Sequence, residues 1–109
     1  MIDRQTRSLY IRQAAVLKAL AHPLRVAIVD YLRDGERCVC DIAAHVGAER
    51  SNVSRHLAVM LRAGLVDCRR EGLTVFYGLR TRCVLTFLSC AVRAARQRAA
   101  EEARILELR

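Results

Sequence analysis

Two cysteines separated by a single valine, Cys38 and Cys40, are the residues of this chain best suited to specific chemistry. On a regular helix their side chains would point about 200° apart, whereas in an extended segment both point to the same side. The stretch from Glu36 to Cys40 is short and β-prone, so we expect it to be extended. One soft, thiophilic ion would then bridge both sulfur atoms. The alternative is that both cysteines are small packing residues.

Three further cysteines bring the total to five. Cys83 and Cys90 lie seven residues apart on a predicted last helix, hence on one face. We expect them to pack at an interface, with sensing, including a sulfur-based redox switch, as the alternative. Cys68, on a predicted strand, is expected to be structural. An odd number of cysteines argues against a closed disulfide framework, and the cytosol would keep the thiols reduced.

A second group of side chains is suited to reading DNA. A helix is predicted to end near Ala63, and Ser51 or Asn52 is expected to cap its start. Its buried stripe is predicted to comprise Val53, Leu57, Met60 and Leu61. Arginine and asparagine make bidentate contacts to guanine and adenine, and serines suit phosphates or bases. The candidate DNA-binding residues of this helix are Ser51, Asn52, Ser54, Arg55, His56 and Arg62, although His56 would either face phosphate or pack sideways.

The elements around that polar face predict a helix-turn-helix over about residues 41–63. Asp41 is expected to cap a short helix from Ile42 to Val46, which Gly47 ends. The small Ala43 allows the two helices to pack closely.

A hairpin is predicted next, over about residues 65–79, with strands at 65–70 and 73–79. Arg69 and Arg70 are expected at its tip, where such a wing lies along DNA phosphates.

The flanking segments predict three more helices, at about 7–20, from Pro23 to Asp34, and at 82–108. The last one needs a partner, and a second copy of the chain is the simplest. The fold class is therefore mainly α with a β-hairpin wing, a winged helix-turn-helix with four helices, a hairpin and a fifth helix, in a single domain over residues 1–109. We expect a homodimer.

The charge favours a polyanionic partner. Nineteen basic and eleven acidic residues give a formal net charge of +8, and Lys18 is the only lysine. No apolar run reaches the roughly 18–20 residues that span a bilayer, and residues 1–13 lack the core of a signal peptide. We expect a cytoplasmic protein that binds double-stranded DNA and no membrane.

One spacing matches an enzyme formally. Cys90 and Arg96 have the Cys-x5-Arg spacing of phosphatase loops. That chemistry needs a glycine-bearing loop whose amides hold an oxyanion, and the intervening residues instead predict a helix. We expect no enzyme activity and no organic cofactor.

Six segments of the chain together form a pattern typical of one family. These segments are Leu20–Arg25, Cys38–Ile42, Ser54–Leu57, Arg62–Val66, Arg69–Gly72 and Val75–Tyr77. As a set they resemble the ArsR/SmtB family of metal- and metalloid-responsive repressors. The resemblance covers roughly residues 15–80 and implies a homodimer that leaves a partly palindromic operator when an inducer binds.

In that family, the box resembling Cys38–Ile42 binds As(III) or Sb(III) in one branch and Cd(II) or Pb(II) in another. The arsenic branch often adds a third cysteine where this chain has Ala43, and the cadmium branch adds cysteines from an N-terminal arm, whereas residues 1–37 contain none. As(III) needs three sulfur ligands and Cd(II) four, which favours As(III). The third ligand stays open among Cys83, Cys90, a cysteine of a second copy and a small cellular thiol.

The family's zinc-type site uses histidines and carboxylates on the last helix. This helix has no histidine, so sensing of zinc, nickel or cobalt there is not expected. Three alternatives to arsenic sensing remain: a Cd(II)/Pb(II) sensor, a repressor whose cysteines respond to oxidants or reactive sulfur, and a DNA-binding module that acts through a partner protein at the last helix.

Overall fold

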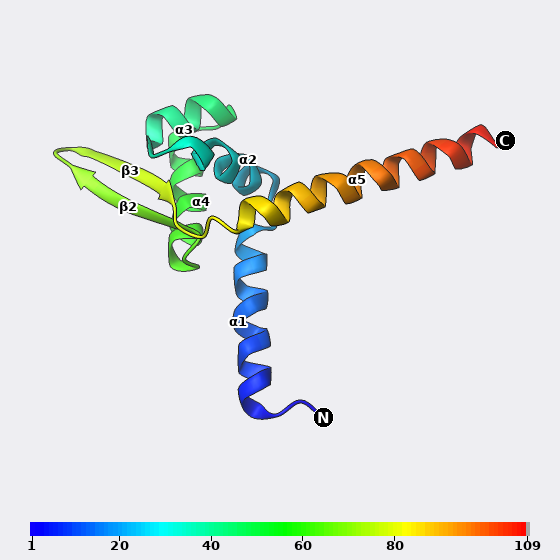
Figure 1. The fold of residues 1–109 in the computed structure, drawn as a ribbon. Helices are drawn as coiled ribbons and strands as arrows, with labels where there is room; N and C mark the ends of the chain where they lie inside the picture. Colours follow the sequence, from blue (N-terminus) through cyan, green and yellow to red (C-terminus); the bar gives the residue numbers. More distant parts are fainter. Residues whose placement is uncertain (109) are drawn as a thin grey trace.

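The computed structural model describes residues 1–108 and has the predicted order of elements (Figure 1). It is mainly helical with a β-hairpin, as the sequence predicts. In chain order the elements are α1 (Arg4–Leu20), α2 (Pro23–Tyr31), the 3-10 turn η1 (Leu32–Asp34), β1 (Arg37–Cys38), α3 (Val39–Val46), α4 (Arg50–Arg62), β2 (Val66–Glu71), β3 (Thr74–Leu79) and α5 (Val84–Glu107). No helix in this part of the chain is long and apolar enough to cross a bilayer.

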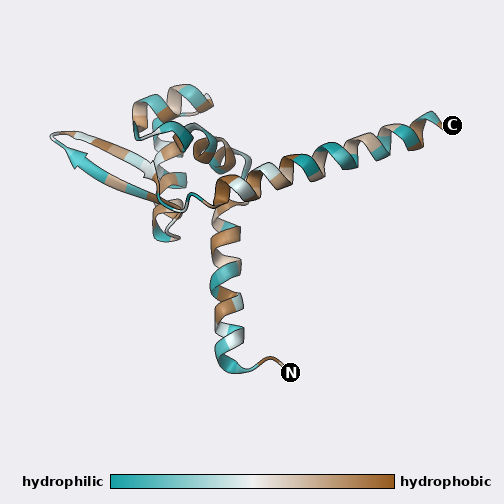
Figure 2. Cartoon of the chain, in the orientation of Figure 1, coloured by the Kyte–Doolittle hydropathy of each residue, from teal (hydrophilic) through white to brown (hydrophobic). Residues whose placement is uncertain are grey.

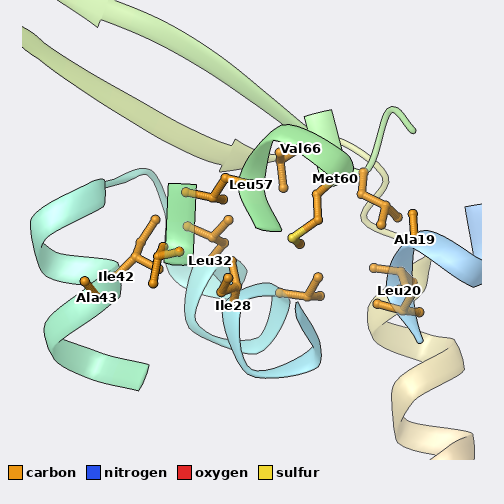
Figure 3. Close-up of a cluster of buried hydrophobic side chains, with 13 residues drawn as sticks. Ala19, Leu20, Ile28, Leu32, Ile42, Ala43, Leu57, Met60 and Val66 are labelled. Atoms are coloured by element: carbon orange, nitrogen blue, oxygen red, sulfur yellow. The ribbon is translucent and has the colours of Figure 1, made fainter. Parts of the chain in front are cut away.

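The core lies where α2, α3 and α4 meet the base of the hairpin (Figure 3). Leu57 and Met60 of α4 face Ile28 of α2, and all three side chains are fully buried. The other completely buried side chains are Val29, Leu32, Ile42, Val53 and Leu65. This packing fixes which face of α4 points inward and therefore which face remains exposed.

The turn between α3 and α4 depends on Gly47. This residue has φ +69° and ψ +38°, a left-handed conformation that glycine adopts without steric cost. The backbone N–H of Ala48 donates to the carbonyl oxygen of Ala43 at 3.1 Å, which closes the end of α3. Ala43 itself is buried against the core, as its small side chain predicts.

The wing is a three-stranded antiparallel sheet in the order β1-β3-β2 rather than a hairpin alone. Cys38 of β1 pairs with Phe76, and Arg69 of β2 pairs with the same residue from the other side. The turn residues are Gly72 and Leu73, so the prediction that Arg69 and Arg70 lie at the tip is wrong: both lie within β2.

Four helix starts differ from the predictions, each because another residue takes the capping position. Helix α1 begins three residues early, since Asp3 accepts a hydrogen bond from the backbone N–H of Thr6 at 2.6 Å. Helix α3 begins at Val39 after Cys38, and α4 at Arg50 after Glu49. Asp41, Ser51 and Asn52 therefore lie inside first turns rather than at caps. Helix α5 begins at Val84, two residues later than predicted.

Helices α1 and α5 project from this body in different directions (Figure 1). Ala19 and Leu20 are the buried residues of α1, and Val84 is the one buried residue of α5. Both helices carry apolar residues along their free length (Figure 2). The large exposed ones include Leu9, Ile11, Leu17, Phe87, Val92 and Ile105.

Candidate DNA interface and thiol site

The exposed face of α4 is polar at its start and carries no acidic side chain. It lies opposite the buried stripe of Val53, Leu57 and Met60, which confirms those three positions, whereas Leu61 is 38% exposed and not buried as predicted. The small Ala58 lies in the middle of the exposed face and leaves room for close approach of a ligand. The exposed residues at helical spacing are Ser51, Ser54, Arg55, Ala58 and Arg62.

Asn52 and Arg55, the two predicted base readers, contact each other. The Nη2 of Arg55 donates to the Oδ1 of Asn52 at 3.2 Å. Asn52 is half-buried, whereas Arg55 is exposed. A guanidinium has five N–H donors, so this bond leaves Arg55 with donors to spare and restricts its orientation.

His56 packs sideways against α2 rather than outward. Its Nδ1 accepts a hydrogen bond from the Nε of Arg25 at 3.0 Å, and its ring centroid lies 4.4 Å from that of His22. Burial and then the nearby charges of His22, Arg25 and Arg55 lower the pKa of His56 below its usual 6.5. Arg25 also donates to the carbonyl oxygen of Ala19, so His56 joins α4 to the start of α2 and the end of α1.

The role of Arg25 in joining α1, α2 and α4 was not predicted. Its only sequence signal is its position in the Leu20–Arg25 segment. A hydrogen bond across 31 positions cannot be deduced from local pattern.

The two wing arginines, Arg69 and Arg70, differ in their contacts with acidic side chains. The Nε of Arg69 donates to both carboxylate oxygens of Glu36, at 2.9 and 3.0 Å, and its Nη1 to Glu71 at 2.7 Å. The guanidinium also lies over the ring of Phe76, 4.8 Å from the centroid. The hydrogen bonds that Arg69 donates to Glu71 and Glu36 raise the pKa of its guanidinium. Arg70 is exposed and forms no ion pair within residues 1–108.

The prediction of an extended Cys-Val-Cys segment is wrong. Cys38 is extended, with φ −80° and ψ 162°, and it caps α3, whereas Cys40 is already the second residue of that helix. The strand ends here because the chain turns from β1 into α3. Cys38 is half-buried and Cys40 is exposed.

Both thiols nevertheless line one cavity of about 270 Å³ between the start of α3 and the tip of the wing. Arg50, the first residue of α4, also lines it, and sequence reasoning did not single out this residue. The complete lining is Cys38, Val39, Cys40, Arg50, Leu73, Thr74 and Val75.

The remaining cysteines lie elsewhere. Cys83 caps α5 and lines a separate cavity of about 190 Å³ with Leu17 and Phe87. Cys90 is exposed on α5, and Cys68 is exposed on β2 opposite Tyr77. Across residues 1–108, no three histidine, cysteine or acidic side chains gather to hold a metal ion. The structure thus does not bring Cys83 or Cys90 to the thiol pair within one chain.

Comparison with known proteins identifies the family. Residues 22–67 match the model described as bacterial regulatory protein, arsR family. The chain is 32% identical over 104 residues to Rv0081 of Mycobacterium tuberculosis, an uncharacterized HTH-type transcriptional regulator, covering 94% of this chain and 91% of that protein. The chain belongs to the ArsR family.

Solved structures agree with this assignment. NolR from Sinorhizobium fredii matches with a TM-score of 0.77 at 28% identity, covering 86% of this chain and 94% of NolR. The homodimeric winged helix-turn-helix DNA-binding domain of Mb0332 from Mycobacterium bovis matches with a TM-score of 0.78 at 30% identity, covering 92% and 93%. This ArsR-family chain is therefore a transcriptional regulator with a winged helix-turn-helix DNA-binding fold, and not an enzyme.

Proposed function

We propose that this regulator is a homodimeric repressor that binds operator DNA and is released when As(III) or Sb(III) binds Cys38 and Cys40. The observation that carries the inducer assignment is the shared cavity, which contains both thiols together with the first residue of α4. In the reducing cytosol, where we expect the chain to act, these thiols are free to bind a thiophilic ion.

A second copy of the chain is the partner that suits α1 and α5. Their exposed apolar side chains include Leu17 at 51%, Phe87 at 52% and Val92 at 48%. Apolar faces of this extent usually mark an interface. The similar domain of Mb0332 is homodimeric. A dimer presents two copies of α4 to two half-sites of one operator.

We assign base contacts to the start of α4, because recognition helices meet base edges with their N-terminal residues. Arg55 would read guanine and Asn52 adenine, with Ser51 and Ser54 on bases or phosphates. Arg62, Arg69 and Arg70 would contact phosphates, Arg70 most directly because Glu36 and Glu71 already hold Arg69. His56 would act by positioning α4 through its bond to Arg25.

The thiols are the reactive groups in inducer binding. Each thiol of Cys38 and Cys40 condenses with one hydroxyl of arsenous acid, As(OH)₃, forming one S–As bond and releasing one water. Two such steps leave one hydroxyl on the bound arsenic. No electrons are transferred, so neither an oxidant nor a reductant is needed.

Inducer binding reaches the DNA through α3. Bridging the thiols ties Cys40, in the first turn of α3, to Cys38 at the end of β1. Helix α3 packs directly on α4 through Ile42 and Ala43. A change at the start of α3 therefore alters the position of α4 and lowers the affinity for DNA. Because this coupling is reciprocal, bound DNA lowers the affinity for the inducer by the same factor.

Fluorescence anisotropy of the protein on a duplex from its own promoter, titrated with arsenite under reducing conditions, tests this proposal. We expect arsenite to release the wild type and the Cys68→Ser control, whose cysteine lies outside the cavity, but not the Cys38→Ser/Cys40→Ser double variant. Release of the double variant would place the inducer elsewhere. A tight DNA complex that ignores arsenite but responds to Cd(II), Pb(II) or a persulfide would replace arsenic by that inducer.

A further inference from the structure

Arg50 is the one charged residue among the seven that line the thiol cavity. It is exposed, and its side chain forms no ion pair or hydrogen bond within the described part of the chain. No acidic side chain lines the cavity to offset its charge. An anion that enters this space therefore meets a guanidinium available for pairing.

The same cavity supplies two sulfur ligands and no third. Cys38 and Cys40 are its only thiols, and residues 1–108 contain no cluster of three ligand side chains. As(III) bound to this pair retains one hydroxyl, which is open to exchange for another thiol. That thiol must come from outside the cavity.

The cavity has room for such a ligand. Its volume of about 270 Å³ is many times the roughly 10–15 Å³ that one water molecule needs. Leu73 and Val75 offer apolar contact for the body of a small molecule, and Arg50 offers a charged contact for its acidic groups.

We propose that the third ligand is a small anionic thiol of the glutathione type, whose carboxylate pairs with Arg50. This inference rests on the proposed function of the thiol pair. Its thiol replaces the last hydroxyl of the bound arsenic, forming the third S–As bond and releasing the third water. Arg50 then acts as a specificity residue that selects anionic over neutral or cationic thiols.

The position of Arg50 gives this contact a consequence for DNA binding. As the first residue of α4, it immediately precedes Ser51 and Asn52. A carboxylate that holds Arg50 in the cavity attaches the inducer to the recognition helix itself, in addition to the path through α3. The anionic thiol would thus promote release as well as complete the coordination of arsenic.

The test compares arsenite titrations of the DNA complex in glutathione and in glutathione diethyl ester, which has the same thiol but no carboxylates. A partly exposed ion pair contributes roughly 0.2–1 kcal/mol, so we expect glutathione to lower the arsenite midpoint up to about fivefold in the wild type. Arg50→Gln should remove this preference. Arg62→Gln, which removes the same charge from the far end of α4, should keep it whatever its DNA affinity.

Each outcome decides between the two proposals. Equal midpoints for the two thiols in the wild type, or a preference that survives Arg50→Gln, would overturn the role of Arg50 and leave arsenic sensing standing. No release by arsenite with either thiol would overturn both.

Discussion

The body of the molecule, formed by α2, α3, α4 and the wing, buries its apolar side chains within one chain, whereas the projecting helices α1 and α5 leave theirs exposed. Helices α2, α3 and α4 cover one another's apolar faces, so that Ile28, Ile42 and Leu57 are fully buried within one chain. Along α1 and α5 the apolar side chains remain exposed, Phe87 by 52% and Ile11 by 65%. The core of the DNA-binding body is therefore complete in a single chain, whereas the apolar side chains of α1 and α5 need a second copy to cover them. Stability and association should respond to different residues.

The largest effect is expected in the body. Leu57→Ala removes a side chain with no exposed surface and leaves a cavity, so the free energy of unfolding should fall by about 2–5 kcal/mol. Urea unfolding at fixed protein concentration measures this change, because the stability of a dimer depends on concentration. Leu9→Ala on the exposed part of α1 is the matched control. A loss of equal size in the control would contradict the contrast between the two regions.

The projecting helices should govern association instead. Phe87→Ala removes an aromatic side chain that we expect to be buried between copies, a change of roughly 1.5–3 kcal/mol. The dimer dissociation constant should then rise by about ten- to a hundredfold. Sedimentation velocity over a range of protein concentrations measures it. A monomeric wild type at micromolar concentration would refute the dimer.

Within the body, α4 should supply contacts that depend on the DNA sequence, whereas the wing should supply contacts that do not. Arg55→Ala is expected to weaken operator binding by about 1–3 kcal/mol and to relax base preference at one position. Arg70→Ala should weaken binding to all sequences alike and reduce the salt slope by about 1. Anisotropy titrations on operator and scrambled duplexes at several salt concentrations separate the two. An Arg55 variant with unchanged discrimination would remove that residue from base readout.

The smallest effect concerns pH. Because the pKa of His56 is lowered in the fold from 6.5, the unfolded chain takes up a proton first as the pH falls. Stability and DNA affinity should therefore be unaffected by this group above about pH 6.5 and decline below it. Protonation also removes the acceptor that Nδ1 offers to Arg25. His56→Gln should flatten the decline in urea unfolding measured from pH 7.5 to 5.5, and an unchanged decline would exclude His56 as its cause.

The elements that were predictable from sequence are those with strong local signals. Apolar residues at helical spacing predicted α4, and Gly47 predicted the end of α3. The change to alternating apolar and polar residues predicted the two strands of the hairpin. Helix starts were less predictable, because Cys38 and Glu49 precede α3 and α4 without a side-chain capping bond. The predicted caps Asp41, Ser51 and Asn52 consequently lie two or three positions after the residues that precede these helices in the structure.

The parts of the site that sequence could not supply depend on contacts between distant segments. The bond from Arg25 to His56 and the pairing of Arg69 with Glu36 join residues more than thirty positions apart. Likewise, the wing tip meets the thiols at the start of α3 only through the pairing of β1 with β3. A local reading therefore identified Cys38 and Cys40 but not Arg50 beside them.

X-ray absorption at the arsenic edge tests the central claim most directly. It counts the sulfur atoms bound to arsenic in the arsenite-loaded protein. With one arsenite per chain in the presence of glutathione, the account predicts three sulfur ligands in the wild type and in Cys68→Ser. It predicts loss of protein-bound arsenic in the Cys38→Ser/Cys40→Ser double variant. Arsenic that remains bound to the double variant through sulfur would show that this regulator holds its inducer at other cysteines.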